Sequence, residues 1–303
     1  MVLEKTTVQQ KSLGYMNFFD QMKYRYQTFS VVERLIVIMV ACFVLPFLLR
    51  TIFYLFSAPF DQYFTWFQLS SSFDDLLFRP WTLISYAFFH GDFGHILWNM
   101  ILLHFAGRMM VNLFKTNLFI NTFFLGVLIG GITFVLSYNF FPAFQGQSPR
   151  LIGSSAGVMA VLIFMCSYMP YKDVRILVFN IKLIYIGLFF VVLDLIQIPV
   201  SNAGGHLAHL GGAMTGYIYQ RNISRGNDIG QWISNIASYF SSLFSFKKTK
   251  VRKVYTSTKP KPKQNKSEVD QAKIDAILDK ISQSGYASLT KEEKELLFRA
   301  GKS

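Results

Sequence analysis

Six long apolar runs constrain the fold of this chain more than any other feature of its sequence. They lie roughly at 35–56, 94–113, 118–138, 152–169, 181–198 and 206–221. About 20 mostly apolar residues are enough for a helix to cross the hydrocarbon core of a bilayer. Only 16% of the residues are charged, whereas soluble domains have about a quarter. The sequence therefore predicts an all-α integral membrane protein with six transmembrane helices.

Lysine and arginine lie almost entirely on one side of these runs. All but three of the 30 basic residues precede the first run, follow the sixth, or lie in the two loops on that same side. The exceptions are Arg50, Arg79 and Arg150. Because cytoplasmic loops are enriched in Lys and Arg, both termini are predicted to be cytoplasmic. The net charge of +13 is then a signal of orientation in the cell membrane, not of nucleic-acid binding.

Two regions next to the runs have a distinct composition. Residues 1–33 form a polar and mixed cytoplasmic segment before the predicted six-helix core, 34–222. Within the core, the outer loop 57–93 is rich in aromatic residues. Aromatic rings with one polar edge are stable at the membrane interface. The loop is therefore expected to fold back into the outer interface.

Two further segments follow the sixth run on the predicted cytoplasmic side. Apolar residues at helical spacing predict an amphipathic helix on the inner interface within 223–246. Residues 247–266 hold nine basic groups, two prolines and no acid. Such a composition favours a basic linker that contacts anionic membrane lipids over a nucleic-acid-binding segment.

The last segment, 267–303, has the pattern of a small helical pair. Charged and apolar residues alternate at helical spacing, and a turn is expected at Gly285. The sequence from Thr290 to Glu293 matches a capping box at the start of a second helix. Because so few residues bury only a small core, the pair is expected to dock on another surface.

Polar clusters interrupt the runs at three places that the topology brings to one depth. Each cluster stands at the start of a run that follows an outer loop. Polar groups in a membrane are costly enough to be functional candidates by default. The clusters are Gly153 to Gly157 before the fourth run, His90, His95 and Asn99 around the second, and His206 and His209 at the sixth.

The pattern Gly153-x-Ser155-x-Gly157 does not identify a nucleophile by itself. In soluble α/β-hydrolases it marks a serine on a strand-to-helix elbow. No strand is expected before it in this chain, and a membrane helix follows. Small residues also allow helices to pack closely, so close packing is an alternative interpretation of this motif.

Small residues of the fourth and sixth runs form two faces that match. A stripe of histidine and glycine lets another backbone approach the imidazole closely. The match would bring the Ser155 hydroxyl within about 3 Å of His209, as a nucleophile and its base require. These faces consist of Gly153, Gly157 and Ala160 in the fourth run and His209, Gly212 and Gly216 in the sixth.

One face of the second run can present hydrogen-bond donors to the same point. His95 and Asn99 are four residues apart and share a helix face. Together with the backbone N–H of Ser155 they have the composition of an oxyanion hole. The sequence thus predicts a serine, a base and oxyanion donors at one depth.

These motifs give the chain a resemblance to rhomboid intramembrane serine proteases. The resemblance covers about residues 35–221 and rests on the order, spacing and placement of three motifs. They are His90-x4-His95-x3-Asn99 in the second run, Gly153-x-Ser155 at the fourth, and Ala208-His209-x2-Gly212-x3-Gly216 in the sixth.

The resemblance implies a six-helix rhomboid-like bundle and a serine endopeptidase that needs no cofactor or metal. Ser155 would attack the scissile carbonyl, and His209 would act as general base and acid. His95, Asn99 and the Ser155 amide would hold the oxyanion. The implied substrates are transmembrane segments of other membrane proteins, cut near the outer face. The residues with a supporting role would be His90, Gly153, Gly157, Gly212 and Gly216.

The resemblance and the spacing of its motifs imply no catalytic role for three neighbouring polar residues. Rhomboids have no acidic third member, so Asp194 in the fifth run is expected to be a packed or gate-lining residue. The glycine spacing selects His209 over His206 as the base. The Gly-x-Ser spacing selects Ser155 over Ser154 as the nucleophile.

Two other functions fit parts of the pattern. A metal site could use His90, His95, His206 and His209, but zinc proteases of the HExxH kind need a paired Glu. No carboxylate accompanies these histidines on their own predicted helices. A non-proteolytic rhomboid relative that binds or unfolds membrane clients is the second alternative. Such relatives typically lack the serine or the histidine, and both are present here.

Overall fold

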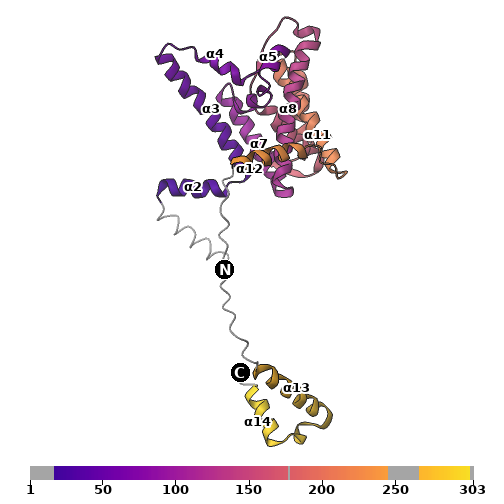
Figure 1. Cartoon of the computed structure of the whole chain (residues 1–303). Coiled ribbons are helices and arrows are strands. Elements are labelled where there is room, and N and C mark those ends of the chain that lie inside the picture. The colour runs from indigo at the N-terminus through magenta and orange to yellow at the C-terminus, as the bar shows by residue number, and fades with distance from the viewer. Residues whose placement is uncertain (1–16, 177, 245–265, 301–303) are drawn as a thin grey trace. The chain divides into compact units, whose positions relative to one another are not determined.

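The computed structural model describes residues 17–176, 178–244 and 266–300. The chain divides into two compact units, 1–245 and 246–303, and each is described by itself (Figure 1). Both units are mostly helical. In the first unit, six helices occupy the six predicted runs, in the same order along the chain.

Three of these helices are long and apolar enough to cross a membrane. They are α3 (Val31–Leu55), α7 (Phe93–Leu113) and α8 (Thr116–Phe140). Two shorter apolar helices follow, α9 (Ser155–Tyr168) and α10 (Leu183–Gln197). The sixth, α11 (Ala203–Ile223), carries polar residues and glycines along its length. Three of the six predicted spans are thus helices long enough to cross a membrane. The other three spans stay predictions.

Helix α9 differs from its neighbours because it is short and almost fully buried. Its 14 residues correspond to about 21 Å at 1.5 Å per residue, less than the roughly 30 Å of a hydrocarbon core. It packs against α7, α8 and α11. Eleven of its residues are buried, so α9 forms the centre of the bundle, and its first residue, Ser155, is half-buried.

Backbone contact joins α9 to α11, the two helices with the predicted small-residue faces. A methyl group at Gly212 would lie 2.1 Å from the carbonyl oxygen of Ala156, and one at Gly216 would lie 2.1 Å from that of Ala160. Only glycine therefore fits these two places. Gly157 was expected to share this contact, but it faces α8, where a methyl group would meet the Phe123 ring at 2.7 Å.

The outer loop between α3 and α7 folds into short elements with aromatic contacts. The Trp81 indole N–H donates to the Trp66 carbonyl at 2.9 Å, and the two rings stack with centroids 6.0 Å apart. The Arg79 guanidinium lies 4.5 Å from the Trp66 ring centroid. The elements are α4 (Phe60–Phe64), η1 (Thr65–Phe67), β1 (Leu69–Ser70), α5 (Phe73–Phe78), α6 (Thr82–Ser85) and η2 (Tyr86–Phe88).

A short strand, β2 (Arg150–Leu151), precedes α9, although no strand was expected before the Gly-x-Ser motif. It pairs antiparallel with β1 of the outer loop, with Leu69 opposite Leu151. The Gly153 N–H then donates to the Tyr86 carbonyl at 3.0 Å. Two residues are too few to show the alternation that reveals a strand in a sequence. These bonds tie the segment before Ser155 to the outer loop.

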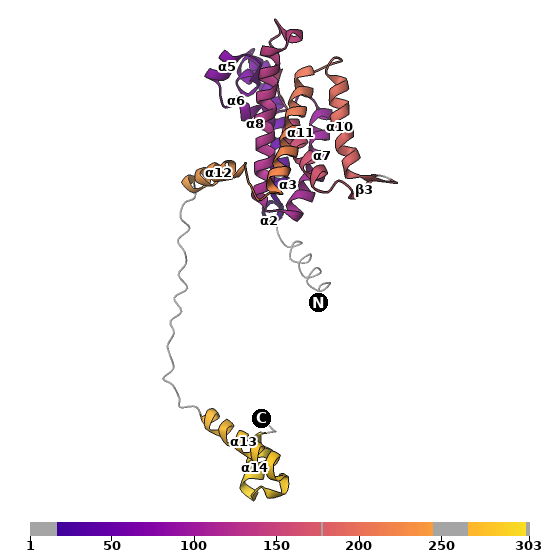
Figure 2. The ribbon, with the colours of Figure 1, turned by 90° about the vertical axis from the view of Figure 1, so that its right-hand side faces the viewer.

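Three shorter elements complete the connections. A turn of 3-10 helix, η3 (Pro142–Phe144), follows α8. Between α9 and α10, strands β3 (Asp173–Ile176) and β4 (Phe179–Lys182) form an antiparallel hairpin. Figure 2 shows this hairpin beside the lower end of α10, and α10 beside α11.

Two helices flank the bundle in the chain. Helix α2 (Phe18–Thr28) lies within the predicted N-terminal segment, where the sequence analysis anticipated no element. Helix α12 (Gln231–Phe244) lies within the predicted amphipathic segment, but it is shorter, because α11 continues to Ile223 and a turn separates the two helices. The predicted basic linker lies outside the described residues except for Lys266, where α13 begins.

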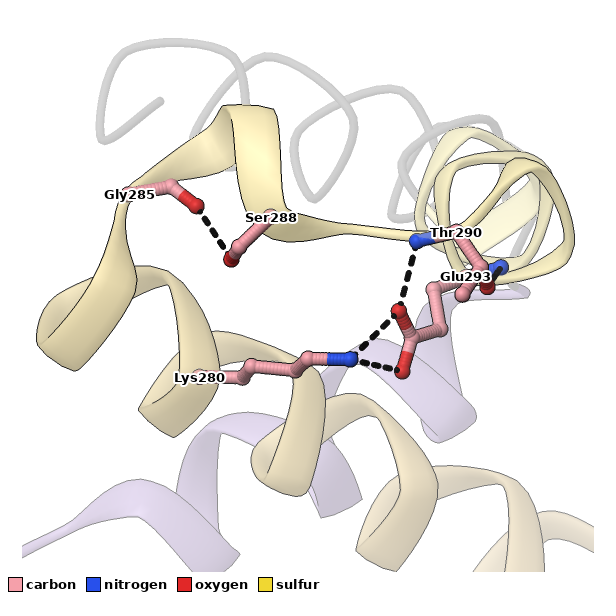
Figure 3. Close-up of polar contacts among 5 residues, drawn as sticks. All are labelled: Lys280, Gly285, Ser288, Thr290 and Glu293. Atoms are coloured by element: carbon pink, nitrogen blue, oxygen red, sulfur yellow. Dashed lines mark hydrogen bonds and ion pairs between the residues drawn. The ribbon is translucent and has the colours of Figure 1, made fainter.

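The second unit contains a pair of helices. Helices α13 (Lys266–Ser284) and α14 (Lys291–Ala300) flank η4 (Tyr286–Ser288), and Gly285 has a positive φ of 76° at the predicted turn. The predicted capping box is present, since the Thr290 N–H donates to Glu293 at 2.8 Å and the Glu293 N–H donates to the Thr290 hydroxyl at 3.3 Å. Lys280 reaches the same carboxylate at 2.9 Å (Figure 3).

Candidate functional site

Ser155 is the first residue of α9, and its hydroxyl meets an imidazole from α11. The Ser155 Oγ lies 2.6 Å from Nε2 of His209. This short distance follows from the glycine contact described above, because backbone contact at Gly212 fixes α11 close to the start of α9. The structure therefore brings together the two residues that the sequence analysis selected as nucleophile and base.

The other ring nitrogen of His209 meets a carboxylate from α10. His209 Nδ1 lies 2.8 Å from Asp194 Oδ1. An ionised carboxylate only accepts hydrogen bonds, so with Asp194 ionised the hydrogen of His209 resides on Nδ1. The lone pair of Nε2 then points at the Ser155 hydroxyl. In this tautomer His209 can accept the serine proton.

The same carboxylate oxygen also meets the second histidine of α11. His206 Nδ1 lies 2.7 Å from Asp194 Oδ1. Asp194 is 5% exposed. Asp194 is thus buried, in agreement with the predicted packed residue, and it also contacts both histidines, which was not predicted. Its position in α10 is close to Ala203, where α11 begins, because a short turn joins the two helices.

His95 lies beside the nucleophile, at the start of α7. Gly153 has a φ of +126°, and a methyl group there would lie 2.7 Å from His95 Nε2 and 3.7 Å from Ser155 Oγ. The backbone N–H of His95 donates to the Asp92 carboxylate at 2.8 Å. Asp92 thereby caps the start of α7. Glycine at 153 therefore leaves room for the imidazole next to the serine, as an oxyanion donor requires.

Asn99 is buried one turn further along α7. Its side-chain amide donates to the His95 carbonyl at 2.9 Å. An amide nitrogen carries two hydrogens, so one is left for a substrate oxygen. The contribution of Asn99 to an oxyanion hole stays a prediction.

His90 and Ser154 form a separate contact next to the site. His90 Nε2 lies 3.1 Å from the Ser154 hydroxyl, and its ring centroid lies 5.0 Å from that of His95. Burial lowers the pKa of His90 to about 3, so its ring is neutral at physiological pH. Ser154 thus pairs with His90, while Ser155 pairs with His209. His90 supports the segment that carries the nucleophile.

Three side chains of the site also form a possible metal donor set. The ligand atoms of Asp194, His206 and His209 lie within 4.8 Å of one another. Two imidazoles and a carboxylate suit zinc, and α10 supplies the carboxylate that the histidines lack on their own helix. The same atoms, however, are joined by hydrogen bonds, and His209 also meets Ser155. The same contacts also suit transfer of a proton from Ser155 to His209.

Comparison with known proteins assigns parts of the chain to two families. The rhomboid domain family matches residues 78–226, which include every site residue described above. A family of unknown function, DUF6576, matches residues 263–302 in the tail. The RHOMBOID-like protein 12, mitochondrial, of Arabidopsis thaliana is 29% identical over 161 residues, 49% of this chain and 48% of that protein. The chain thus spans about half the length of this relative. The domain and the apolar helices identify a membrane protein.

Proposed function

Because the chain belongs to the rhomboid family, we propose that it is an intramembrane serine endopeptidase that cleaves transmembrane segments of other membrane proteins. The observation that carries this proposal is the 2.6 Å contact between Ser155 Oγ and His209 Nε2. A serine hydroxyl is a weak nucleophile until a base removes its proton. The contact supplies that base at hydrogen-bond distance.

The reaction proceeds in two halves at Ser155. The hydroxyl attacks the scissile carbonyl as His209 takes its proton, and His209 then gives this proton to the leaving amine. Water hydrolyses the acyl-enzyme in the second half, with His209 again acting as base. Atoms balance because the two products carry the elements of one water molecule.

Oxyanion stabilisation comes from donors around the start of α9. The Ser155 N–H lies at a helix N-terminus, where unpaired N–H groups and the helix dipole favour negative charge. His95 and Asn99 approach from α7. Removal of one such donor typically slows a serine protease by about 10²–10³-fold, so we assign these residues a large share of the rate.

The proposed orientation puts both termini in the cytoplasm and the site toward the outer face of the cell membrane. Water reaches Ser155 from that side, because hydrolysis needs a supply that hydrocarbon does not provide. The basic linker would contact anionic lipids of the inner leaflet. The partners are therefore transmembrane substrates and lipids, with no role for nucleic acid, a cofactor or a metal.

Labelling with a fluorophosphonate probe tests the proposal. In detergent or liposomes the full chain should be labelled, and Ser155→Ala and His209→Ala should lose the label. Ser154→Ala is the matched control and should keep it, because Ser154 contacts His90 instead. Labelling that survives Ser155→Ala would overturn the assignment of the nucleophile.

A cleavage assay against a panel of single-span membrane proteins tests the substrate class. Cleavage near the outer end of a span, lost in Ser155→Ala and insensitive to EDTA, is the expected result. A chain that is neither labelled nor active would instead be a non-proteolytic rhomboid relative that binds membrane clients. Loss of cleavage with EDTA would indicate a metal site at Asp194, His206 and His209.

A further inference from the structure

One carboxylate oxygen serves two imidazoles at the junction of α10 and α11. Asp194 Oδ1 lies 2.7 Å from His206 Nδ1 and 2.8 Å from His209 Nδ1. The Asp194 side chain is 8% exposed, and those of the two histidines are 16% and 21% exposed. A buried carboxylate is stable only when hydrogen bonds or opposite charges compensate for its lost hydration. Here the compensation comes from the base of the proposed reaction and its neighbour.

The geometry fixes more than the position of the His209 ring. With both Nδ1 atoms donating to Asp194, rotation of the His209 ring by 180° would replace a donor by a carbon at the carboxylate. The Nε2 lone pair therefore stays directed at Ser155, 2.6 Å away. A hydrogen bond to one ring nitrogen determines which nitrogen carries the proton.

We propose that Asp194 is a positioning residue that holds His209 in the tautomer that accepts the Ser155 proton, and that His206 holds Asp194 in place. This inference rests on the proposed function and deepens it, because it adds an acidic third member to a serine–histidine pair. Asp194 touches no reacting atom and acts through His209. The imidazolium that forms when Ser155 loses its proton then lies against a carboxylate within the bundle.

His206 contributes through a second hydrogen bond to the same oxygen. His206 lies on the helix that also carries His209. Two side chains of α11 therefore hydrogen-bond to Asp194 near the end of α10. Loss of this donor frees the carboxylate to turn away from His209. An asparagine at 206 would retain a donor at a similar distance from the backbone, whereas leucine would remove it.

Kinetics of the full chain in liposomes test the inference. Asp194→Asn should lower kcat by between about 10-fold and the roughly 10⁴-fold seen when an amide replaces the carboxylate behind a serine-protease histidine, with KM within about 2-fold.

Matched variants separate a loss of His209 positioning from a general loss of folding. Asp61→Asn makes the same change at an exposed carboxylate of the outer loop that pairs with Arg50, and it should leave kcat and KM unchanged. Asp194→Glu should recover part of the rate. His206→Leu should lower kcat, and His206→Asn should restore most of it. Thermal unfolding of each variant identifies any that fail to fold.

The state of the ring can also be read without activity. The chain has five histidines, so ¹⁵N spectra of histidine-labelled protein resolve the His209 tautomer once His209→Ala identifies its signal. The Nδ1–H form should dominate in the full chain and be lost in Asp194→Asn. An unchanged tautomer, or an unchanged kcat, would overturn the inference. A wild-type protein that shows this tautomer but does not react with the probe would contradict only the proposed protease activity.

Discussion

The α9–α11 contact and helix α10 hold their parts of the site in different ways. Ser155 and His209 lie on two helices in backbone contact at Gly212 and Gly216. Asp194 lies on a helix with only four buried residues, Leu183, Ile186, Gly187 and Asp194. Most of the remaining α10 side chains are large, apolar and exposed. The positions of Ser155 and His209 are thus fixed by the backbone, whereas that of the Asp194 carboxylate depends on a few side-chain contacts.

This difference predicts how the site responds to change. Interiors are close-packed and transmit displacements, so a side chain inserted between α9 and α11 must move the helices themselves. Side chains on the exposed face of α10 are predicted to contact lipid, and lipid can rearrange around a substituted side chain.

The largest effect is expected where the backbones touch. Gly212→Ala places a methyl group 2.1 Å from the Ala156 carbonyl oxygen, which cannot move without α9. Overpacking of this kind costs about 1–3 kcal/mol, and the separation of Ser155 from His209 should lower kcat more than 100-fold, given that misplacement by 1 Å already costs about 10²-fold. Thermal unfolding and cleavage kinetics measure the two effects.

Gly91→Ala is the matched control for this prediction. A methyl group at Gly91 meets Ile152 Cδ1 at 3.8 Å, an ordinary contact distance. Stability and activity should stay close to wild type. Equal losses in the two variants would show that the α9–α11 contact has no special sensitivity.

A smaller effect is expected where α10 packs on α9. A methyl group at Gly187 would lie 3.0 Å from the Cys166 side chain, which can yield by a few tenths of an ångström. Gly187→Ala should therefore lower kcat by less than about 10-fold and stability by less than about 1 kcal/mol, below the usual range for overpacking. A loss as large as that of Gly212→Ala would break the contrast between the two helix pairs.

The exposed face of α10 should tolerate substitution. Phe189 and Ile196 are 59% and 62% exposed, and their side chains face the predicted lipid. Phe189→Leu and Ile196→Leu should change kcat by less than about 2-fold, since surface substitutions away from special features alter stability by about 0.5 kcal/mol or less. A strong loss in either would assign this face a role in substrate contact.

The smallest effect on the site is expected from a change at Glu293 in the second unit, because its contacts lie within that unit. The Thr290 N–H and the Lys280 ammonium lower the pKa of Glu293 below its usual value. The stabilisation they give is present at neutral pH and is lost as pH falls through that lowered pKa. The protection factor against hydrogen exchange in the first turn of α14 should fall on acidification, and Glu293→Gln should lower it in the same way at neutral pH with unchanged labelling of Ser155.

The spacing of small residues was enough to predict the Ser155–His209 pair. His209, Gly212 and Gly216 recur on one helix face, and that regularity depends only on helix geometry. The partner of this face was only partly predictable: Ala156 and Ala160 contact the glycines, while Gly157 turns to α8. Rotation of α9 about its axis decides this, and a helix that is small and apolar all round gives no signal of its rotation.

The role of Asp194 was not predictable from spacing. It lies on a different helix from both histidines, and the contact depends on the angle at which α10 turns into α11. A buried acid in an apolar run was the available signal. Strand β2 was also missed, because its partner β1 lies far away in the sequence, within the outer loop. Both features depend on contacts between different elements of the fold, which the local spacing of residues does not reveal.

The shared carboxylate has a consequence for charge inside the bundle. The proposed mechanism requires an ionised Asp194 and neutral histidines before attack, which together carry one negative charge. When the Ser155 proton moves to His209, the imidazolium and Asp194 balance each other, and the negative charge appears on the oxyanion instead. In the proposed attack the bundle thus gains no net charge, and it avoids the cost of several kcal/mol that a new uncompensated ion has in a medium of low dielectric constant. In effect, the reaction moves a charge that folding has already buried.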